Sequence, residues 1–312
     1  MDRRTLAGLR ITAQGLSTTA AWPSVHAAVS AFGAHQGQDV PGVVASLALR
    51  TSGEVGPVVD AFTSGRIVRG YPMRGTVFAV AAEDLTWMTE LCAGAAVRAA
   101  VKRRPRLGLE DSHVARAADL LVALAHDRSA PGRGTGVPRA ELLEAWRSAG
   151  IDPAGGRGYH LLVHLISTGV AAYGPWTGDE TAVVDAARWL PSGSGLSERF
   201  DGDRVAAAAE LLRRYLQSHG PATLRDFAWW TKLPLGIVRA AFPLIVDTVE
   251  SGAIPGTDET AHWRPGLMEE YAAGERDAMR ELLLPGFDEL ILGYPDRLAF
   301  MSAADHAALV PG

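Results

Sequence analysis

Residues 66–80 read Arg66-Ile67-Val68-Arg69-Gly70-Tyr71-Pro72-Met73-Arg74-Gly75-Thr76-Val77-Phe78-Ala79-Val80. Two runs rich in β-branched residues flank turn-forming Gly and Pro, a pattern that predicts a β-hairpin. Apolar periodicity upstream predicts three helices, over residues 22–35, 43–50 and 54–63. Asp39 is expected to cap the second of these helices. Three helices followed by a hairpin is the order of elements in a winged helix.

The same order of elements recurs twice further along the chain. Helices are expected over 112–126, 138–149 and 159–167, with a wing at 170–173 and 181–184. A third set has helices over 204–219, 224–231 and 235–245, with less regular strands at 244–249 and 261–264. We therefore expect a mainly α protein with small β-hairpins (α+β), built from three tandem winged-helix (helix-turn-helix) units around a basic cleft. The expected units are residues 1–108, 109–191 and 192–282, followed by a C-terminal segment at 283–312.

The composition argues against a membrane-spanning protein, a secreted protein and a disulfide-stabilised protein. The chain has 312 residues, 47% of them hydrophobic, and a net charge of −5. No apolar run approaches the ~20 residues that span a bilayer, and the N-terminus lacks a signal-peptide core. The lone Cys92 excludes an internal disulfide and makes a cysteine-based metal site unexpected. We expect a cytoplasmic protein without a membrane partner, and a monomer.

Charge is distributed unevenly along the chain. Residues 1–110 carry 12 Lys and Arg against 8 Asp and Glu, a balance of +4, whereas residues 251–312 carry 4 against 11, a balance of −7. This asymmetry favours a basic face on the N-terminal part. Candidate DNA-binding cations in the first wing are Arg66, Arg69 and Arg74. Further candidates are Lys102, Arg103 and Arg104 in a dense basic run downstream, which is alternatively a solvated linker.

The expected recognition helices carry few polar side chains of the kind that read base edges. Glu54 and Asp60 lie in the first, and Arg239 is the only cation in the third. Sequence-specific readers place three or four polar residues in the major groove. This argues against a transcriptional regulator, although a non-catalytic winged-helix DNA-binding protein stays an alternative function.

Gln36 and Gln38 stand at the junction between the first two expected helices. Val25, Val29 and Phe32 form one apolar face, and Gln36 is the next position on it. A buried amide without partners costs ~1–3 kcal/mol. The two glutamines either bond to nearby backbone or serve a ligand, and the glycine between them lets another backbone come close.

Three runs resemble the AlkZ-type winged-helix DNA glycosylases: His35-Gln36-Gly37-Gln38-Asp39, Ser46-Leu47-Ala48-Leu49-Arg50 and Pro72-Met73-Arg74-Gly75-Thr76. Residues 283–297 are similar to the C-terminal signature of that family. The resemblance implies a monofunctional hydrolase that cuts the N-glycosidic bond of N7-alkylated purines in double-stranded DNA. Some members of the family also unhook interstrand crosslinks. The resemblance also implies that Gln36 and Gln38 are the catalytic pair and that no cofactor is needed. Since family members continue into a further β-rich segment, we expect the C-terminal part to be shortened here.

The chemistry that this resemblance implies suits an amide. An N7-alkylated purine is cationic and leaves the sugar as a neutral molecule, so the enzyme need only hold water and stabilise the sugar. A glutamine orients water through its carbonyl oxygen and is a poor base, which leaves normal DNA intact. Two positions depart from the family pattern, Gly37 in place of a larger aliphatic residue and Phe78 in place of histidine. Altered substrates or a catalytically decayed member are therefore further alternatives.

Other polar or aromatic groups are expected to be structural. His160 and His164 have metal-ligand spacing on one helix, but no third ligand accompanies them, and we expect no metal. Trp229-Trp230 is expected in the core, with base stacking as the alternative. A structural polar network is expected from Asp288, Glu289, Asp296 and Arg297.

Overall fold

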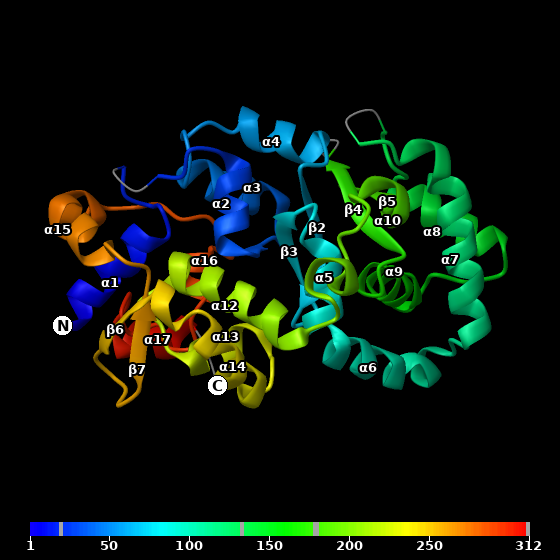
Figure 1. The fold of residues 1–312 in the computed structure, drawn as a ribbon. Helices are drawn as coiled ribbons and strands as arrows, with labels where there is room; N and C mark the ends of the chain where they lie inside the picture. The colour runs from blue at the N-terminus through cyan, green and yellow to red at the C-terminus, as the bar shows by residue number, and fades with distance from the viewer. Residues whose placement is uncertain (19–20, 132–133, 177–180, 310–312) are drawn as a thin grey trace. The chain divides into compact units, whose positions relative to one another are not determined.

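The computed structural model describes residues 1–18, 21–131, 134–176 and 181–309, which fall into two compact units (Figure 1). Unit 1 combines Met1–Val55 with Arg204–Gly312, and unit 2 is Gly56–Asp203. The first expected winged-helix unit is thus divided, since two of its helices belong to unit 1 and its third helix and hairpin to unit 2. Within the described ranges, no helix is long and apolar enough to cross a membrane.

The N-terminal part of unit 1 contains α1 (Arg3–Ala13), α2 (Val25–Phe32), β1 (His35–Gln36) and α3 (Val40–Leu49). The prediction that a helix runs over 22–35 is wrong at its end, because Gly33 adopts a φ of 78° and terminates α2. A side chain at Gly33 would also meet Leu211 at 2.8 Å. Gln36 therefore lies on a short strand and not on the helix face expected for it.

The N-cap predicted for α3 is confirmed. The Asp39 carboxylate accepts a hydrogen bond from the Gly42 amide at 2.7 Å, and Pro41 lies in the first turn. The capping fixes where β1 ends and α3 begins. As a result, Gln36 and Gln38 stand on a short connection between two well-defined helices.

The C-terminal part of unit 1 confirms two predicted helices, α12 (Arg204–His219) and α13 (Leu224–Thr231). Thr223 and Asp226 form a capping box at the start of α13. The following helix, α14 (Leu235–Ala241), is shorter than predicted and continues as 3-10 turns η3 (Phe242–Leu244) and η4 (Val246–Thr248). The remaining elements are β6 (Glu250–Ala253), β7 (Thr260–Trp263), α15 (Leu267–Ala278), α16 (Glu289–Leu292) and α17 (Ala303–Leu309).

The strand predicted at 244–249 is misplaced, because η3 and η4 occupy those residues and the strand β6 follows them. Strand β6 pairs antiparallel with β7, with Glu250 opposite Trp263. Trp263 and Leu267 pack with Leu6 and Leu9 of α1 in one apolar cluster. The N-terminal helix, which the sequence analysis did not assign, thus completes the core beneath this hairpin.

Unit 2 opens with α4 (Gly56–Thr63) and the predicted hairpin, now β2 (Ile67–Met73) and β3 (Thr76–Ala81). Its register runs from Ile67 opposite Ala81 to Met73 opposite Thr76. Arg74 and Gly75 form the two-residue turn with φ of 58° and 70°. Positive φ at both central residues is what a two-residue hairpin turn of type I′ requires.

The helices of unit 2 surround the second predicted wing. They are α5 (Leu85–Cys92), α6 (Gly94–Arg103), α7 (Asp111–Ala125), α8 (Arg139–Ser148), α9 (Arg157–Ser167), α10 (Ala186–Trp189) and α11 (Leu196–Phe200), with 3-10 turns η1 (Arg104–Leu107) and η2 (His126–Arg128). The wing strands are β4 (Ala171–Trp176) and β5 (Thr181–Asp185). Residues 132–133 of the predicted loop and 177–180 of the wing lie outside the described residues.

The two wings predicted for separate units share one sheet within unit 2. Its strands lie in the order β3-β2-β4-β5, and Arg69 on β2 pairs with Tyr173 on β4. Below them, Leu121, Trp146 and Leu161 belong to one buried cluster, and the Trp146 indole donates to the Ala117 carbonyl at 3.1 Å. Mixed α and β structure with small antiparallel sheets is confirmed, whereas the three tandem winged-helix units stay a prediction.

Candidate active site

The two candidate glutamines occupy different environments on the connection after α2. Gln36 lies on β1 and is 8% exposed, whereas Gln38 is exposed just before the cap of α3. Among the described residues, the Oε1 of Gln36 is buried and has no hydrogen-bond partner. An unsatisfied buried carbonyl is costly in a folded protein. This oxygen is therefore the atom of the pair best placed to accept from a ligand or a water molecule.

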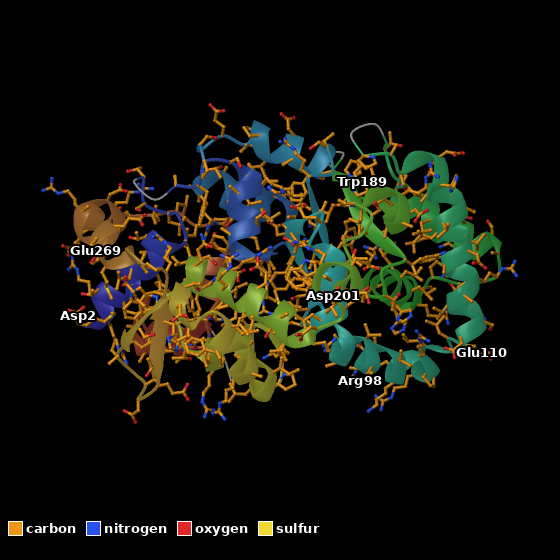
Figure 2. All side chains as sticks on the ribbon, in the orientation of Figure 1. Asp2, Arg98, Glu110, Trp189, Asp201 and Glu269 are labelled. Atoms are coloured by element: carbon orange, nitrogen blue, oxygen red, sulfur yellow. The ribbon has the colours of Figure 1, made fainter. Side chains whose placement is uncertain are left out.

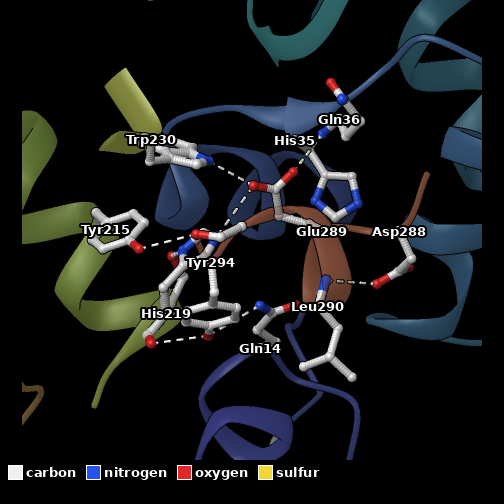
Figure 3. Close-up of polar contacts among 12 residues, drawn as sticks. Gln14, His35, Gln36, Tyr215, His219, Trp230, Asp288, Glu289, Leu290 and Tyr294 are labelled. Carbon is white, nitrogen blue, oxygen red and sulfur yellow. Dashed lines mark hydrogen bonds and ion pairs between the residues drawn. The ribbon is translucent and has the colours of Figure 1, made fainter. Parts of the chain in front are cut away.

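The main chain of Gln36 is held by a buried carboxylate from the far end of the chain. Its amide donates to Oε2 of Glu289 at 3.0 Å, as Figure 3 shows. The other oxygen of Glu289 accepts from the Trp230 indole at 2.7 Å and lies 3.3 Å from Nε2 of His219. Figure 3 also shows the Gln36 side chain pointing away from this cluster. Glu289 thus fixes the strand and leaves the amide side chain available.

A second buried group supports His35, the residue before Gln36. His35 Nε2 lies 2.8 Å from the Ser46 hydroxyl, which donates to Oδ2 of Asp288 at 2.5 Å. Asp288 also accepts two hydrogen bonds from the Arg50 guanidinium, at 2.7 and 2.9 Å. This bidentate pair joins α3 to the segment that carries Glu289. The predicted structural polar network is therefore confirmed for Asp288 and Glu289. Asp296 is exposed and accepts from the Leu298 amide at 2.8 Å instead, and Arg297 Nε has no hydrogen-bond partner among the described residues.

The network extends to three further buried groups. Arg50 donates to Oε1 of Gln14 at 2.7 Å, and the Gln14 amide lies 3.3 Å from the Tyr294 hydroxyl. Tyr294 in turn donates to the His219 carbonyl at 2.9 Å. Tyr215 stacks on the His219 ring with centroids 4.4 Å apart. Side chains from the C-terminal ends of α1 and α3, from α12 and from residues 288–294 thus form one continuous support.

Protonation within this network is governed by burial and by Arg50. Burial, and then the charge of Arg50, lower the pKa of His35 to about 3, so its ring is neutral at pH 7. Burial opposes ionisation of Asp288, but Arg50 outweighs it and lowers the pKa of that carboxyl to about 2. Burial also lowers the pKa of His219.

The neutral state of His35 fixes its tautomer. Because the Ser46 hydrogen goes to Asp288, its oxygen accepts from His35, which places the ring hydrogen on Nε2. Nδ1 of His35 is then an acceptor, and it has no hydrogen-bond partner in the part of the chain that the structure describes. Two adjacent residues, His35 and Gln36, thus each present one buried acceptor without a protein donor.

The six candidate DNA-binding cations divide by exposure. Arg66, Lys102 and Arg103 are exposed. Arg69 is buried and donates to the Thr181 hydroxyl at 2.6 Å, and the half-buried Arg74 lies over the Phe78 ring at 5.1 Å. Arg104 is buried, pairs with Asp111 and lies 2.6 Å from Nε2 of His164. Contact with a phosphate is thus open to the exposed cations without rearrangement, whereas Arg69 and Arg104 already hold partners within unit 2.

The remaining candidates have structural surroundings. His164 is engaged by Arg104, and no group of three or more metal-ligating side chains occurs among the described residues. Trp230 is fully buried, which confirms the prediction that this tryptophan belongs to the core. Sequence reasoning missed Gln14, His219 and Tyr294 as members of the network. The run at 283–297 was a usable signal for Tyr294, but nothing local marks Gln14 or His219.

Most of the chain matches a known protein family. A family model described as DNA glycosylase AlkZ-like matches residues 29–312. The chain belongs to the AlkZ-like DNA glycosylase family. Its resemblance to that family, drawn from the glutamine pair and the 283–297 run, is thereby confirmed.

A solved structure supports the same fold for this family member. The Streptomyces sahachiroi DNA glycosylase AlkZ matches with a TM-score of 0.68 at 19% sequence identity, covering 99% of this chain and 82% of that one. At this level of identity the likeness concerns the fold alone. A search among curated proteins finds no match.

Proposed function

We propose that this AlkZ-like protein is a monofunctional glycosylase that hydrolyses the N-glycosidic bond of N7-alkylated purines in double-stranded DNA, including purines joined in interstrand crosslinks. The observation that carries the proposal is the state of Gln36. Its main chain is fixed by buried Glu289, while its buried Oε1 has no hydrogen-bond partner among the described residues. A fixed acceptor of this kind orients a water molecule by taking one of its hydrogens.

The bond changes follow from the charge of the substrate. The water oxygen bonds to the anomeric carbon, and the electron pair of the N-glycosidic bond passes to the cationic purine, which leaves neutral. The proton lost by the water goes to solvent. An amide suffices for this reaction because the leaving group needs no proton. Gln38, which is exposed, is assigned to contacts near the scissile nucleotide.

A crosslinked purine is too bulky to be flipped into a tight pocket as a small lesion is. The proposal therefore includes an open, basic binding cleft and no closed base pocket around the glutamines. A complex with lesion DNA that encloses a flipped base beside Gln36 would contradict this part of the proposal.

The test uses duplex DNA with a single N7-methylguanine, incubated with the protein and then treated with alkali to cleave abasic sites. Gln36→Ala is expected to lower the single-turnover rate about 100-fold, because misplacement of the reacting water costs about that much. We expect a smaller loss, about tenfold, for Gln38→Ala, which removes one substrate contact. Gln217→Ala is the matched control, since this half-buried glutamine on α12 accepts a hydrogen bond from Arg213 at 3.3 Å and is not part of the network that supports Gln36.

Strand cleavage that survives in both Gln36→Ala and Gln38→Ala would refute the assigned site. Absence of cleavage in the unaltered protein, with duplex binding intact, would favour the non-catalytic winged-helix binder for this lesion. A duplex carrying a defined N7-linked interstrand crosslink then separates a crosslink-specific glycosylase from such a binder.

A further inference from the structure

A cavity of about 290 Å³ opens within unit 2, between α6, η1 and the first turns of α9. None of the residues that support Gln36 lines it. Its walls are mainly apolar, formed by Ala100, Leu107 and Val163. Ligand sites for small organic groups begin at ~300 Å³ and are lined largely by apolar side chains. The cavity therefore suits one flat group of about the size of a nucleic-acid base.

Two cations stand at the rim of this cavity. Arg103 and Arg106 line it, and both are exposed. Neither guanidinium has an ion-pair partner among the residues that the structure describes. Guanidinium groups without a carboxylate partner are suited to bind a phosphate through paired hydrogen bonds. The apolar walls and the basic rim together require a ligand that is flat at one end and anionic at the other.

The cavity also contains an unsatisfied buried nitrogen. His160 lines it, is 7% exposed, and its Nε2 lacks a hydrogen-bond partner within the described ranges. Burial, and then the charges of Arg104 and Arg103, lower the pKa of His160, so its ring is neutral at pH 7. Nε2 of a neutral imidazole donates in one tautomer and accepts in the other, and base edges offer both acceptors and donors.

An aromatic ring lies beside these groups. Tyr159 lines the cavity and is 51% exposed, so part of its side chain is accessible to a ligand. Stacking of a base on an exposed aromatic side chain is sequence-tolerant and contributes ~1–3 kcal/mol per base. Tyr159 thus supplies the flat face that a base in this cavity would need.

We propose that this cavity binds one unpaired nucleotide of a DNA strand, with its base against Tyr159 and its phosphate on Arg103 and Arg106. His160 pairs with the edge of that base. Inorganic phosphate alone would leave the apolar walls and Tyr159 unused.

A strand is favoured over a free nucleotide because further exposed cations precede Arg103 on α6, at Lys102 and at Arg98. Figure 2 labels Arg98 on this helix. They offer contacts for neighbouring phosphates of the same strand. The proposal rests on the proposed DNA partner but not on cleavage of the glycosidic bond.

The test uses an undamaged single-stranded oligodeoxynucleotide with one 2-aminopurine, whose fluorescence falls when the base stacks. We expect quenching with the unaltered protein and with Tyr159→Phe, which keeps the ring. Tyr159→Ala is expected to abolish the quenching and to raise Kd about tenfold. Arg103→Ala combined with Arg106→Ala should raise Kd about tenfold and reduce its salt dependence. Arg116→Ala, an exposed arginine on α7 that does not line the cavity, is the matched control and should change neither.

Quenching that is equal in Tyr159→Ala and in the unaltered protein would overturn the proposal. Thermal unfolding of each variant checks that a lost signal is not a lost fold. Free 2-aminopurine deoxyriboside monophosphate is tested alongside the oligonucleotide. If its fluorescence is quenched equally well at the same concentration, the claim that the bound nucleotide belongs to a DNA strand is overturned. Because the oligonucleotide carries no lesion, the result is independent of whether the protein proves to be a glycosylase.

Discussion

Arg50 in unit 1 and Arg104 in unit 2 are both buried arginines that contact an aspartate, yet their surroundings differ. Arg50 is fully buried, and its partner Asp288 has a side chain that is 1% exposed. Arg104 contacts Asp111, whose side chain is 93% exposed, and on its other side it meets His164. One pair lies wholly out of water, whereas the other has one member in water.

The two pairs also join very different stretches of chain. Asp288 lies 238 residues from Arg50, while Asp111 lies seven residues from Arg104. A desolvated pair that connects distant segments fixes tertiary structure, and removal of one partner leaves an uncompensated buried charge. A pair with an exposed partner is screened by water and adds little. The same two residue types therefore have a structural role in one unit and a minor one in the other.

The largest effect is expected when the buried pair is broken. Asp288→Ala leaves the Arg50 guanidinium buried without its carboxylate, and we expect unfolding free energy to fall by ~3–5 kcal/mol. Urea denaturation followed by tryptophan fluorescence measures this loss. Restoration of most of the stability by pairing Asp288→Ala with Arg50→Met would support the stranded charge as its cause. A loss below 1 kcal/mol in the single variant would show that water reaches Arg50.

Low pH should destabilise the protein through His35, the buried histidine of the network in unit 1. The folded pKa of His35, about 3, lies below its ordinary value of 6.5. Between these values the unfolded chain binds the extra proton, so the stability contributed by neutral His35 is complete above pH 6.5 and declines as pH falls. The expected loss is ~1.4 kcal/mol per pH unit, or ~2 kcal/mol between pH 6.5 and 5.

The measurement is urea denaturation at several pH values for the protein and for His35→Gln. In His35→Gln the unfolding free energy should fall less steeply as pH is lowered, and the difference should equal the ~2 kcal/mol assigned to His35 between pH 6.5 and 5. His164→Gln is the comparison in unit 2, where burial lowers the pKa of that histidine to about 4. Asp288 does not contribute in this range, because its pKa of about 2 keeps it ionised. Identical slopes for the protein and His35→Gln would contradict the assignment.

Local elements of this fold were predictable from sequence, because their signals are short-range. Helices α12 and α13 and the β2–β3 hairpin occur where the apolar period and turn residues placed them. The end of α2 was missed because the apolar period continues past Gly33, whose backbone conformation terminates the helix. Short-range sequence patterns thus predict whether a segment is a helix or a strand better than they predict the residue at which it ends.

The surroundings of the candidate site were less predictable, because they depend on residues far away in the chain. The carboxylate that holds Gln36 is 253 residues distant, and only the resemblance of the 283–297 run pointed to that segment. The burial of Arg69 depends on packing against β4 and β5, which the charge pattern does not encode. Charge runs therefore suggested cations for DNA but did not show which of them remain exposed.

A moderate effect is expected at Glu289, where the proposed function can be tested through positioning. Glu289→Gln offers one acceptor oxygen for two donors, the Gln36 amide and the Trp230 indole. If Gln36 orients water, the single-turnover rate on N7-methylguanine DNA should fall about tenfold as the strand shifts. Substrate affinity should stay unchanged, because the side chain of Glu289 is buried beneath the strand. Trp230→Phe, which removes one donor, should restore part of the rate in Glu289→Gln. A fall in affinity with no change in rate would contradict this role.

The smallest effect is expected at the exposed pair of unit 2. Asp111→Ala removes the water-exposed partner of Arg104, and we expect a change in unfolding free energy of ~0–1 kcal/mol. His164 still contacts the guanidinium, so Arg104 is not left without a polar neighbour. The variant also frees one side of Arg104 for phosphate, so binding to undamaged duplex DNA should tighten slightly and become more salt-dependent. A loss of more than 2 kcal/mol would instead place Arg104 in the same class as Arg50, and the contrast between a desolvated and a screened pair would no longer separate the two units.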